Sequence, residues 1–402
     1  MFVKTFNIKA LFKFAGCVVR KVLVEGVGVQ VAMRRDGRSK PRCPNCEVAL
    51  NVVREGEIAI YDLPIADKAA VWITLPAIQG RCPKCYELST PRPPEVHPTR
   101  NATWRLMRAV ATWASVCPAS AVAIMFEISE ATVRRYERDV LEADLPKPDF
   151  DNLEILLVDE KSVRKGHGYV TVVLNGLTGE LLHMAEGKKK ESLESFFAKL
   201  TDAQKASIRA VCIDRNGAYR SVLREQLPKA EVVHDRFHII ANLNVALNEV
   251  RRSEWRAARA EGKKAIKGSR FLLTAARENL DDDGLARLLE LTAINANIST
   301  AYILKEEFRH IYAVATSPRS GAMRLRRWCS LVEASGIAPL CRFARGILRD
   351  LPAITAFFKH RITSGRIESF NNQIARVIHR ACGMTNLKHL FLKMRAQSLK
   401  QI

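Results

Sequence analysis

The sequence predicts a multidomain α/β protein. Three observations point to this fold class: two closely spaced cysteine pairs near the N-terminus, a series of short apolar strand-like runs in the middle of the chain, and a long helical stretch after them. With 402 residues, of which 48% are hydrophobic, the chain is long enough for roughly two to four domains and apolar enough to bury a core.

The chain is strongly basic, with 64 Lys and Arg against 42 Asp and Glu and a formal net charge of +22. Residues 1–150 carry +6, residues 151–250 are neutral and residues 251–402 carry +16. This distribution predicts a polyanion-binding protein whose central segment keeps its own carboxylates while the flanking segments contact phosphate. No apolar run reaches the ~18 residues of a membrane span and lysines interrupt the apolar N-terminal stretch, so we expect a cytoplasmic protein without a membrane segment.

Two Cys-Pro-x-Cys motifs predict a structural metal site in a β-rich N-terminal module. Cys43 and Cys46 form the first pair, Cys82 and Cys85 the second, and 35 residues separate them. Two such turns complete a closed tetrahedral Zn²⁺ site. The segment between the pairs contains two apolar-rich runs, 57–63 and 70–75, which we expect to be strands. The alternative is two unrelated reduced cysteine pairs.

A helix-turn-helix pattern follows the proline-rich residues 91–94. Helical stretches are expected over 102–116 and 119–128, and a further helix begins after Ser129, a residue type that often caps helix N-termini. The side chains placed to face a DNA duplex are Ser129, Thr132, Arg134, Arg135 and Arg138. The alternative is an ordinary amphipathic helix pair with a solvated basic face.

The middle of the chain contains apolar strands that end in acidic residues. The run 155–158 ends at Asp159, the run 208–213 ends at Asp214, and the run 231–234 ends at Asp235. Strands over 169–174 and 180–184 and two helical segments complete a βββαβαβ order, which matches an RNase H-like mixed sheet flanked by helices. Carboxylates at such strand ends can share divalent cations, although a single strand-end aspartate is weak evidence.

A basic helical segment of 153 residues separates Asp214 from Glu368. Helices are expected over 237–259, 271–280, 285–308 and 324–351, which predicts an all-α insertion into the core. Arg251 and Arg252 lie in its first basic stretch and are expected to contact phosphate.

Glu368 lies in a further predicted helix. Ile367, Phe370, Ile374 and Ile378 recur at helical spacing as a buried stripe, while Glu368, Asn372 and His379 share another face. Arg376 and Arg380 follow on this helix and are expected to hold a DNA backbone.

Several of these motifs, in this order, resemble the ISL-three family of bacterial insertion-sequence transposases. The matching strings begin at Val158-Asp159-Glu160-Lys161, Asp214-Arg215-Asn216-Gly217, His234-Asp235-Arg236-Phe237-His238 and Ser364-Gly365-Arg366-Ile367-Glu368-Ser369-Phe370-Asn371-Asn372. The cysteine pairs and the helix-turn-helix also occur in this order in the family, so the resemblance covers nearly the whole chain.

The resemblance implies a DNA transposase with the catalytic triad Asp159, Asp214 and Glu368 holding Mg²⁺ or Mn²⁺. Asp235 and His238 match the family's D-x-x-H signature, which we assign to support of the site or of the DNA end. The residues alone leave open an independent metal site of His234, Asp235 and His238, and Asp235 in place of Asp214 as the second acid.

The family also implies structural Zn²⁺, double-stranded DNA as partner (terminal inverted repeats and target), a homodimer or larger assembly on DNA, and association with the nucleoid. The expected domains are a zinc-binding module (1–94), a helix-turn-helix domain (95–150), the first part of an RNase H-like core (151–245), a basic all-α insertion (246–360) and a C-terminal core segment with the third acid (361–402). The rival functions are a zinc-dependent DNA-binding regulator without nuclease activity and a structure-selective RNase H-like nuclease.

Overall fold

A computed structural model of the chain describes residues 8–26, 28–65, 70–164, 168–214, 217–381, 383–384 and 386–399. The chain folds into two compact units. The first consists of Met1–Pro146 together with Val377–Ala396, and the second consists of Lys147–Arg376 together with Gln397–Ile402.

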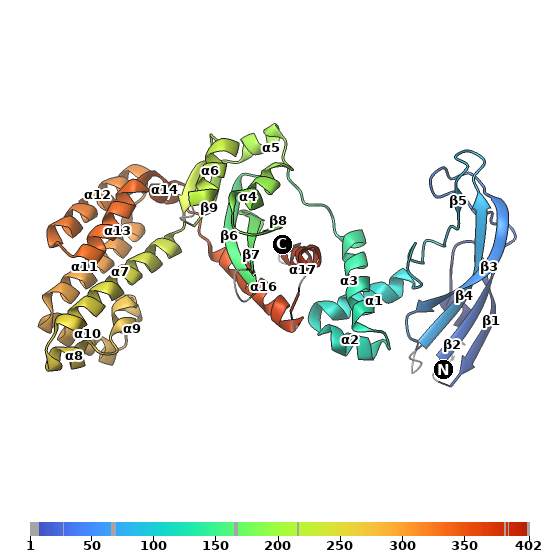
Figure 1. The fold of residues 1–402 in the computed structure, drawn as a ribbon, viewed down its shortest axis with the longest axis horizontal. Helices are drawn as coiled ribbons and strands as arrows, with labels where there is room; N and C mark the ends of the chain where they lie inside the picture. The colour runs from blue at the N-terminus through green and yellow to red at the C-terminus, as the bar shows by residue number, and fades with distance from the viewer. Residues whose placement is uncertain are drawn as a thin grey trace, which may run out of the picture. The chain divides into compact units, whose positions relative to one another are not determined.

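The first unit begins with the short helix η1 (Ile8–Leu11) and a five-stranded sheet (Figure 1). Its strands are β1 (Cys17–Glu25), β2 (Gly28–Arg35), β3 (Asn51–Asp62), β4 (Ala70–Arg81) and β5 (Leu88–Ser89). The order is β1-β2-β4-β3, with β5 on β4, and β2–β4 is the only parallel pair among the described strands of this sheet. Val29, Val31, Val71 and Ile73 alternate along β2 and β4 and are buried, because one face of the sheet covers a core. The predicted strand 57–63 overlaps β3 up to Asp62, and the predicted strand 70–75 is part of the longer β4.

Three helices follow: α1 (Trp104–Val116), α2 (Ala119–Met125) and α3 (Glu130–Asp144). Ser129 caps α3 as predicted, because its Oγ accepts a hydrogen bond from the backbone N–H of Thr132 at 3.2 Å. The second helix ends at Met125 rather than at residue 128, since Glu127 in the following turn has a left-handed backbone with φ +52°. The three helices share one apolar core.

The second unit is built on a mixed five-stranded sheet of order β10-β9-β6-β7-β8 (Figure 1). Its strands are β6 (Ile155–Arg164), β7 (Gly168–Asn175), β8 (Leu181–Glu186), β9 (Ala210–Ile213) and β10 (Glu231–His234). Strands β6, β7 and β8 form an antiparallel meander, and β9 and β10 add in parallel to β6. The connecting helices are α4 (Lys190–Phe197), α5 (Asp202–Ser207) and α6 (Gly217–Gln226). Aromatic and aliphatic side chains of α4 and α6 pack on the apolar residues of the sheet.

One strand boundary differs from the prediction in a way that matters for the site. We expected the first strand of this sheet to end before Asp159, but β6 continues through Asp159 to Arg164. The reason is that β6 has two neighbours: its parallel pairing with β9 stops at Val158, whereas its antiparallel pairing with β7 continues to Arg164. Asp159 therefore lies at the end of the parallel ladder, inside a strand.

All regular structure between Arg236 and His360, a fully described stretch, is helical. Figure 1 shows α7 alongside α11 and α13. The helices are α7 (Arg236–Ala257), α8 (Ala260–Ile266), α9 (Arg270–Thr274), η2 (Arg277–Asn279), α10 (Asp282–Ile294), α11 (Ala296–Val314), α12 (Pro318–Ser335), α13 (Ala338–Arg349), α14 (Leu351–Thr355) and α15 (Phe357–His360).

Two long helices predicted in this stretch are each divided in the structure. The stretch 285–308 breaks at Asn295, whose Oδ1 caps α11 by accepting from the backbone N–H of Ile298 at 2.8 Å. The stretch 324–351 breaks at Gly336, where the left-handed φ of +65° ends α12.

The last two helices are α16 (Gly365–Arg380) and α17 (Leu387–Leu399). We predicted that residues 361–402 would all belong to the core, but Val377–Ala396 belongs to the first unit. The physical reason is a buried contact: His389 and Lys393 of α17 both pair with Glu137 of α3. No helix within the described ranges is both long and apolar enough to cross a bilayer.

Candidate active site and metal centre

Three aspartates follow equivalent positions on the three parallel strands of the second unit. Val158 of β6 pairs with Ile213 of β9, and Ile213 pairs with His234 of β10. The next residue on each strand is an aspartate: Asp159, Asp214 and Asp235. Since successive side chains alternate across a sheet, residues at one register level of parallel strands leave on the same side. The sheet therefore presents three carboxylates along one edge.

Asp159 is half-buried, and each of its carboxylate oxygens accepts a hydrogen bond. Oδ1 accepts from the backbone N–H of Glu160 at 2.8 Å, and Oδ2 accepts from Nδ2 of Asn371 on α16 at 2.7 Å. Burial raises the pKa of Asp159, and the nearby carboxylates of Asp214 and Asp235 act in the same direction. A cation bound nearby would therefore stabilise the charged form of Asp159.

Asp214 is exposed and lies next to His238, which is in the first turn of α7. The distance between Nδ1 of His238 and Oδ2 of Asp214 is 3.8 Å. The proximity of His238 acts to lower the pKa of Asp159, in opposition to burial.

Asp235 has a different environment from the other two aspartates. It is 2% exposed and serves as the N-cap of α7, with Oδ2 accepting from the backbone N–H of His238 at 3.4 Å. It also accepts from the backbone N–H of Ser364 at 3.2 Å and from Ser364 Oγ at 2.6 Å. Asp235 therefore joins the start of α7 to the segment that leads into α16.

The independent metal site of His234, Asp235 and His238 is not assembled. His234 is fully buried, and its Nε2 lies 2.6 Å from Nη2 of Arg220, whose Nη1 donates to Asp350 at 2.9 Å. His238 instead faces Asp214.

Glu368 is exposed in the first turn of α16, four residues after Ser364 and three before Asn371. Ile367, Phe370 and Ile374 of this helix are buried as predicted, whereas the fourth residue of the predicted stripe, Ile378, is half-buried. In the described part of the chain, the cysteine cluster is the only group of three or more possible metal ligands whose atoms all lie within 4.8 Å of one another. Asn371 brings the part of α16 that carries Glu368 to Asp159, but the carboxylates of Asp159, Asp214 and Glu368 do not form one cluster of ligand atoms.

Asn371 and Ser364 are the residues that the sequence reasoning missed. The predicted placement of Asn372 on the face of Glu368 agrees with the structure, where both are exposed four residues apart on α16, but the residue that contacts Asp159 is the neighbouring Asn371. The available signal was the spacing of three residues between Glu368 and Asn371, which puts both on one side of a helix.

The four cysteines of the first unit form a cluster that fits a Zn²⁺ ion. All four Sγ atoms lie within 4.8 Å of one another, and those of Cys43 and Cys85 are 3.7 Å apart. A tetrahedral site with Zn–S bonds of about 2.3 Å places its sulfurs about 3.8 Å apart. The backbone N–H groups of Cys85 and Lys84 lower the pKa of the Cys82 thiol to about 7, which favours the metal-binding thiolate.

The predicted DNA-facing residues of α3 are largely at the surface. Arg134 and Arg135 are exposed, with Arg134 paired to Glu130 at 2.7 Å, while Arg138 and Thr132 are half-buried. The hydroxyl of Ser129 accepts the N-cap hydrogen bond of α3 from the backbone N–H of Thr132, and it lies 2.9 Å from Oγ1 of the same residue.

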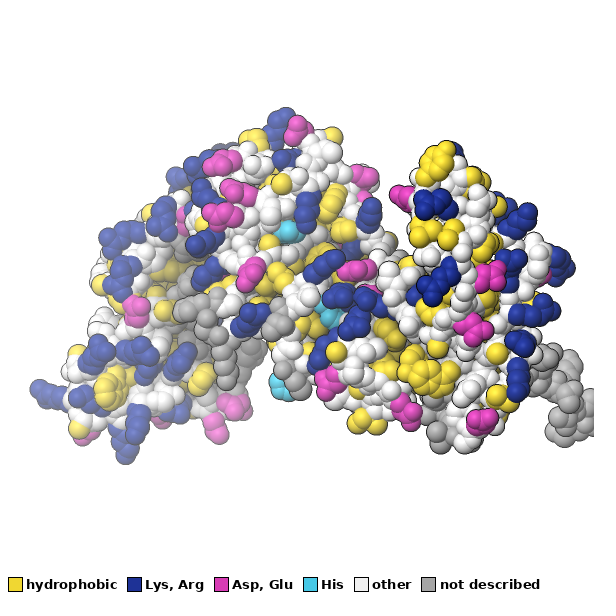
Figure 2. Space-filling view, turned by 45° about the vertical axis from the view of Figure 1, so that its right-hand side comes forward, with side chains coloured by type: hydrophobic (Ala, Val, Ile, Leu, Met, Phe, Trp, Pro, Cys, Tyr) yellow, Lys and Arg dark blue, Asp and Glu magenta, His cyan; other side chains and the backbone are white. Residues whose placement is uncertain are grey.

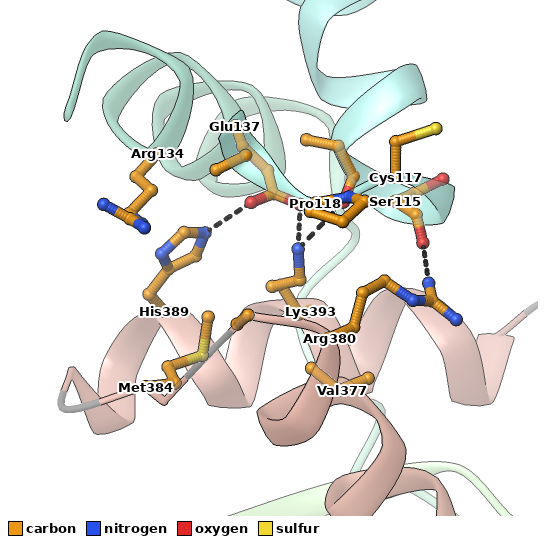
Figure 3. Close-up of a pocket in the computed structure, with 13 residues that line it drawn as sticks. Ser115, Cys117, Pro118, Arg134, Glu137, Val377, Arg380, Met384, His389 and Lys393 are labelled. Carbon is orange, nitrogen blue, oxygen red and sulfur yellow. Dashed lines mark hydrogen bonds and ion pairs between the residues drawn. The ribbon is translucent and has the colours of Figure 1, made fainter. Parts of the chain in front are cut away.

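A buried polar cluster holds α17 against these helices (Figure 3). His389 and Lys393 point from α17 toward Glu137 of α3, with 3.0 Å between Nε2 of His389 and Oε2 of Glu137. Arg380 donates to the carbonyl of Ser115 at 2.8 Å, and both residues belong to the first unit. The pocket between these side chains holds about 30 Å³ of free space, which is too small for a substrate.

The helical stretch of the second unit presents many cations. On the face drawn in Figure 2, Lys and Arg side chains are spread widely, with scattered acidic side chains between them. Arg252 is exposed. Burial together with the charges of Arg252 and Arg270 lowers the pKa of Arg251.

A separate hollow in this unit is lined by Arg342, Arg345 and Arg349 beside Asn242. Arg376 is exposed near the end of this unit's part of α16.

Comparison with known proteins defines the class of this chain. The ISL-three family model described as "Transposase" matches residues 156–394. The transposase for insertion sequence element IS1001 of Bordetella parapertussis is 30% identical over 358 residues, which cover 88% of each chain. The transposase for insertion sequence element IS1557 of Mycobacterium tuberculosis (strain CDC 1551 / Oshkosh) is 31% identical over 299 residues, 68% of this chain and 67% of the relative.

The family match covers more than half of the chain and includes all three predicted acids. The chain therefore belongs to the ISL-three family of insertion-sequence transposases.

Proposed function

We propose that this chain is a DNA transposase of the Asp-Asp-Glu type, which cuts DNA at the terminal inverted repeats of its insertion sequence and joins the ends to target DNA. The observation that carries the proposal is the register of the second sheet, which puts Asp159 and Asp214 side by side at the end of the parallel ladder. The strand order β10-β9-β6-β7-β8 and the helices on the sheet support an RNase H-like core. Family membership supports DNA as the substrate.

Asp159, Asp214 and Glu368 are the proposed metal ligands. Two Mg²⁺ or Mn²⁺ ions held by them would activate the attacking oxygen of water or of a 3′-hydroxyl and neutralise the charge on the departing oxygen. The residues fit these ions because carboxylate oxygens are the donors that hard cations prefer, and because burial disfavours a charged Asp159 without a cation. Asp235 supports the site by holding Ser364, and His238 supports it by facing Asp214.

The remaining modules are proposed to bind DNA. Ser129, Thr132, Arg134, Arg135 and Arg138 at α3, together with the Zn²⁺ module of Cys43, Cys46, Cys82 and Cys85, would recognise the inverted repeats. Arg251, Arg252, Arg376 and Arg380 would contact phosphates. We further propose a cytoplasmic, nucleoid-associated protein that acts as a homodimer or larger assembly, because joining two ends requires both to be held at once.

The test is cleavage of a labelled duplex that carries the terminal inverted repeat of the encoding element, in Mg²⁺, with the cut strand mapped. We expect nicking at the repeat end, followed by strand-transfer products when target DNA is added. Asp159→Ala, Asp214→Ala and Glu368→Ala should each lower cleavage by roughly 10³-fold or more, because each removes an ion ligand. Binding of the duplex should persist in all three.

Glu225→Ala is the matched control, since Glu225 is an exposed acid on α6 of the same unit. Normal cleavage by all three acid variants would reject the triad. Duplex binding with no cleavage by the native chain would favour the regulator, and cleavage without strand transfer would favour the nuclease.

A further inference from the structure

We propose that Asn371 is a positioning residue of the carboxylate site: it orients the Asp159 carboxylate for cation binding and fixes the turn of α16 that carries Glu368 against β6. This inference rests on the proposed function and adds to it a residue that acts through Asp159.

The contact itself is short and buried. Asn371 is 6% exposed, and its Nδ2 donates to Oδ2 of Asp159 at 2.7 Å. The backbone N–H of Glu160 donates to the other carboxylate oxygen at 2.8 Å. Each carboxylate oxygen has about two acceptor positions, so one donor on each oxygen fixes the carboxylate plane and leaves one position per oxygen for a cation.

The chemistry of the donor suits a cation site. Asp159, Asp214 and Asp235 follow one register level of neighbouring strands, so their negative charges repel one another. A lysine or arginine at position 371 would relieve the repulsion but would also compete with a divalent ion for the carboxylate. A neutral amide holds the carboxylate and leaves its charge for the ion.

The oxygen of the Asn371 amide, Oδ1, supports the same inference. Only the NH₂ group can donate to a carboxylate, so the orientation of the Asn371 amide is set by Asp159. Its Oδ1 is buried and finds no hydrogen-bond partner among the described residues. Buried acceptors are seldom left without a donor, so this atom points to a polar group from outside the chain, such as a hydrated cation.

The position of Asn371 along α16 explains why it matters for Glu368. Glu368 precedes Asn371 by three residues, which places the two side chains on one face of the helix. On the other side of Glu368, Ser364 is fixed to Asp235 by two hydrogen bonds, at 2.6 Å and 3.2 Å. The start of α16 is therefore held by hydrogen bonds on both sides of Glu368. Ser364 binds Asp235, which follows β10, and Asn371 binds Asp159 of β6.

The experiment compares Asn371→Ala with Asn372→Ala, a neighbour of the same type that is exposed. Mn²⁺ binding to the full-length, DNA-free protein is measured by electron paramagnetic resonance. Asn371→Ala should weaken Mn²⁺ affinity by about 10-fold or more, as is typical when a residue that orients a metal ligand is removed. Asn372→Ala should match the native protein.

Asn371→Leu separates orientation from packing, because leucine keeps the bulk of the side chain and cannot donate. It should lose Mn²⁺ affinity as Asn371→Ala does. In both variants the Mg²⁺ concentration at half-maximal cleavage should rise, excess Mg²⁺ should restore cleavage, and affinity for the end duplex should stay native. A merely misfolded protein would show no such rescue.

Native Mn²⁺ affinity in Asn371→Ala or in Asn371→Leu would overturn the inference, as would a loss of cleavage that excess Mg²⁺ does not restore. Asp159→Ala, measured in parallel, distinguishes this failure from failure of the proposed function. If Asp159→Ala also keeps native affinity, the carboxylate assignment is wrong. If only Asp159→Ala loses affinity, the triad stands and Asn371 has no positioning role.

Discussion

At the scale of single residues, three aspartates at equivalent register positions have three different surroundings. Asp214 is exposed beside His238, Asp159 is half-buried with a donor on each oxygen, and Asp235 is buried and bonded to Ser364 and to the start of α7. The pattern of acids after apolar runs predicted all three positions. Their surroundings depend on which helix ends reach each strand, and the contacts from α16 and the segment before it, Asn371 to Asp159 and Ser364 to Asp235, each join residues more than 100 positions apart in the sequence.

His183 on β8 is a buried titratable residue of the second unit and should make the stability of the protein depend on pH. It is 5% exposed, with Nδ1 3.0 Å from Nζ of Lys199 and Nε2 3.0 Å from Oγ of Ser195. Burial, and then the charge of Lys199, lower the pKa of His183 to about 4. Because the unfolded chain binds this proton near the ordinary histidine pKa of about 6.5, the stability contribution is present above pH 6.5 and is lost as the pH falls toward 4.

The full pKa difference corresponds to roughly 3 kcal/mol of unfolding free energy. We therefore expect the midpoint temperature of thermal unfolding of the native protein to decrease as the pH is lowered from 6.5 to 4. In His183→Gln this temperature should decrease less over the same pH range. His379→Gln, at an exposed histidine of α16, serves as the control. Equal pH dependence in the native protein and His183→Gln would contradict the assignment.

At the scale of elements, the sequence predicted most strands and helices of the second unit because their apolar patterns are local. Its errors were at boundaries set by partners elsewhere in the chain. Strand β6 runs past Asp159 because β7 pairs there, and α17 joins the first unit because Glu137 lies far away in sequence. Strands β1 and β2 were not predicted. The cysteine cluster was predictable because the Cys-Pro-x-Cys spacing itself brings two sulfurs together.

The pairing of α17 with α3 predicts a difference between two glutamates of α3. Glu137 is 4% exposed and pairs with both Lys393 and His389, whereas Glu142 pairs with Lys388 at 2.8 Å on the surface. Glu137→Ala leaves the Lys393 ammonium without its carboxylate and should destabilise the first unit by about 3–5 kcal/mol. Glu142→Ala should cost only about 0–1 kcal/mol.

Thermal unfolding measures the loss of stability caused by each substitution. Hydrogen exchange should show loss of protection in α17 for Glu137→Ala alone. Equal effects of the two substitutions would mean that the buried cluster does not hold α17 in place.

At the scale of the whole molecule, the first unit has a sheet that ends in a cysteine cluster. Elemental analysis should find one Zn²⁺ per chain, and Cys82→Ser should lose it, because one thiolate of the tetrahedral set is removed. Cys329→Ala, at a buried cysteine of α12 outside the cluster, should keep the metal. A native preparation with no bound metal would exclude the proposed Zn²⁺ site.

The division of the first unit between the two ends of the sequence has a consequence during synthesis. Domains generally fold as they leave the ribosome, with N-terminal segments first. Residues 1–146 emerge long before Val377–Ala396, which complete the same unit. Until α17 has been made, Glu137 lacks both of its side-chain partners, His389 and Lys393. A nascent chain therefore completes its first unit only after Asp159, Asp214 and Glu368 have been translated, so a product that ends shortly after Glu368 would contain these three acids without the α17 partners of Glu137.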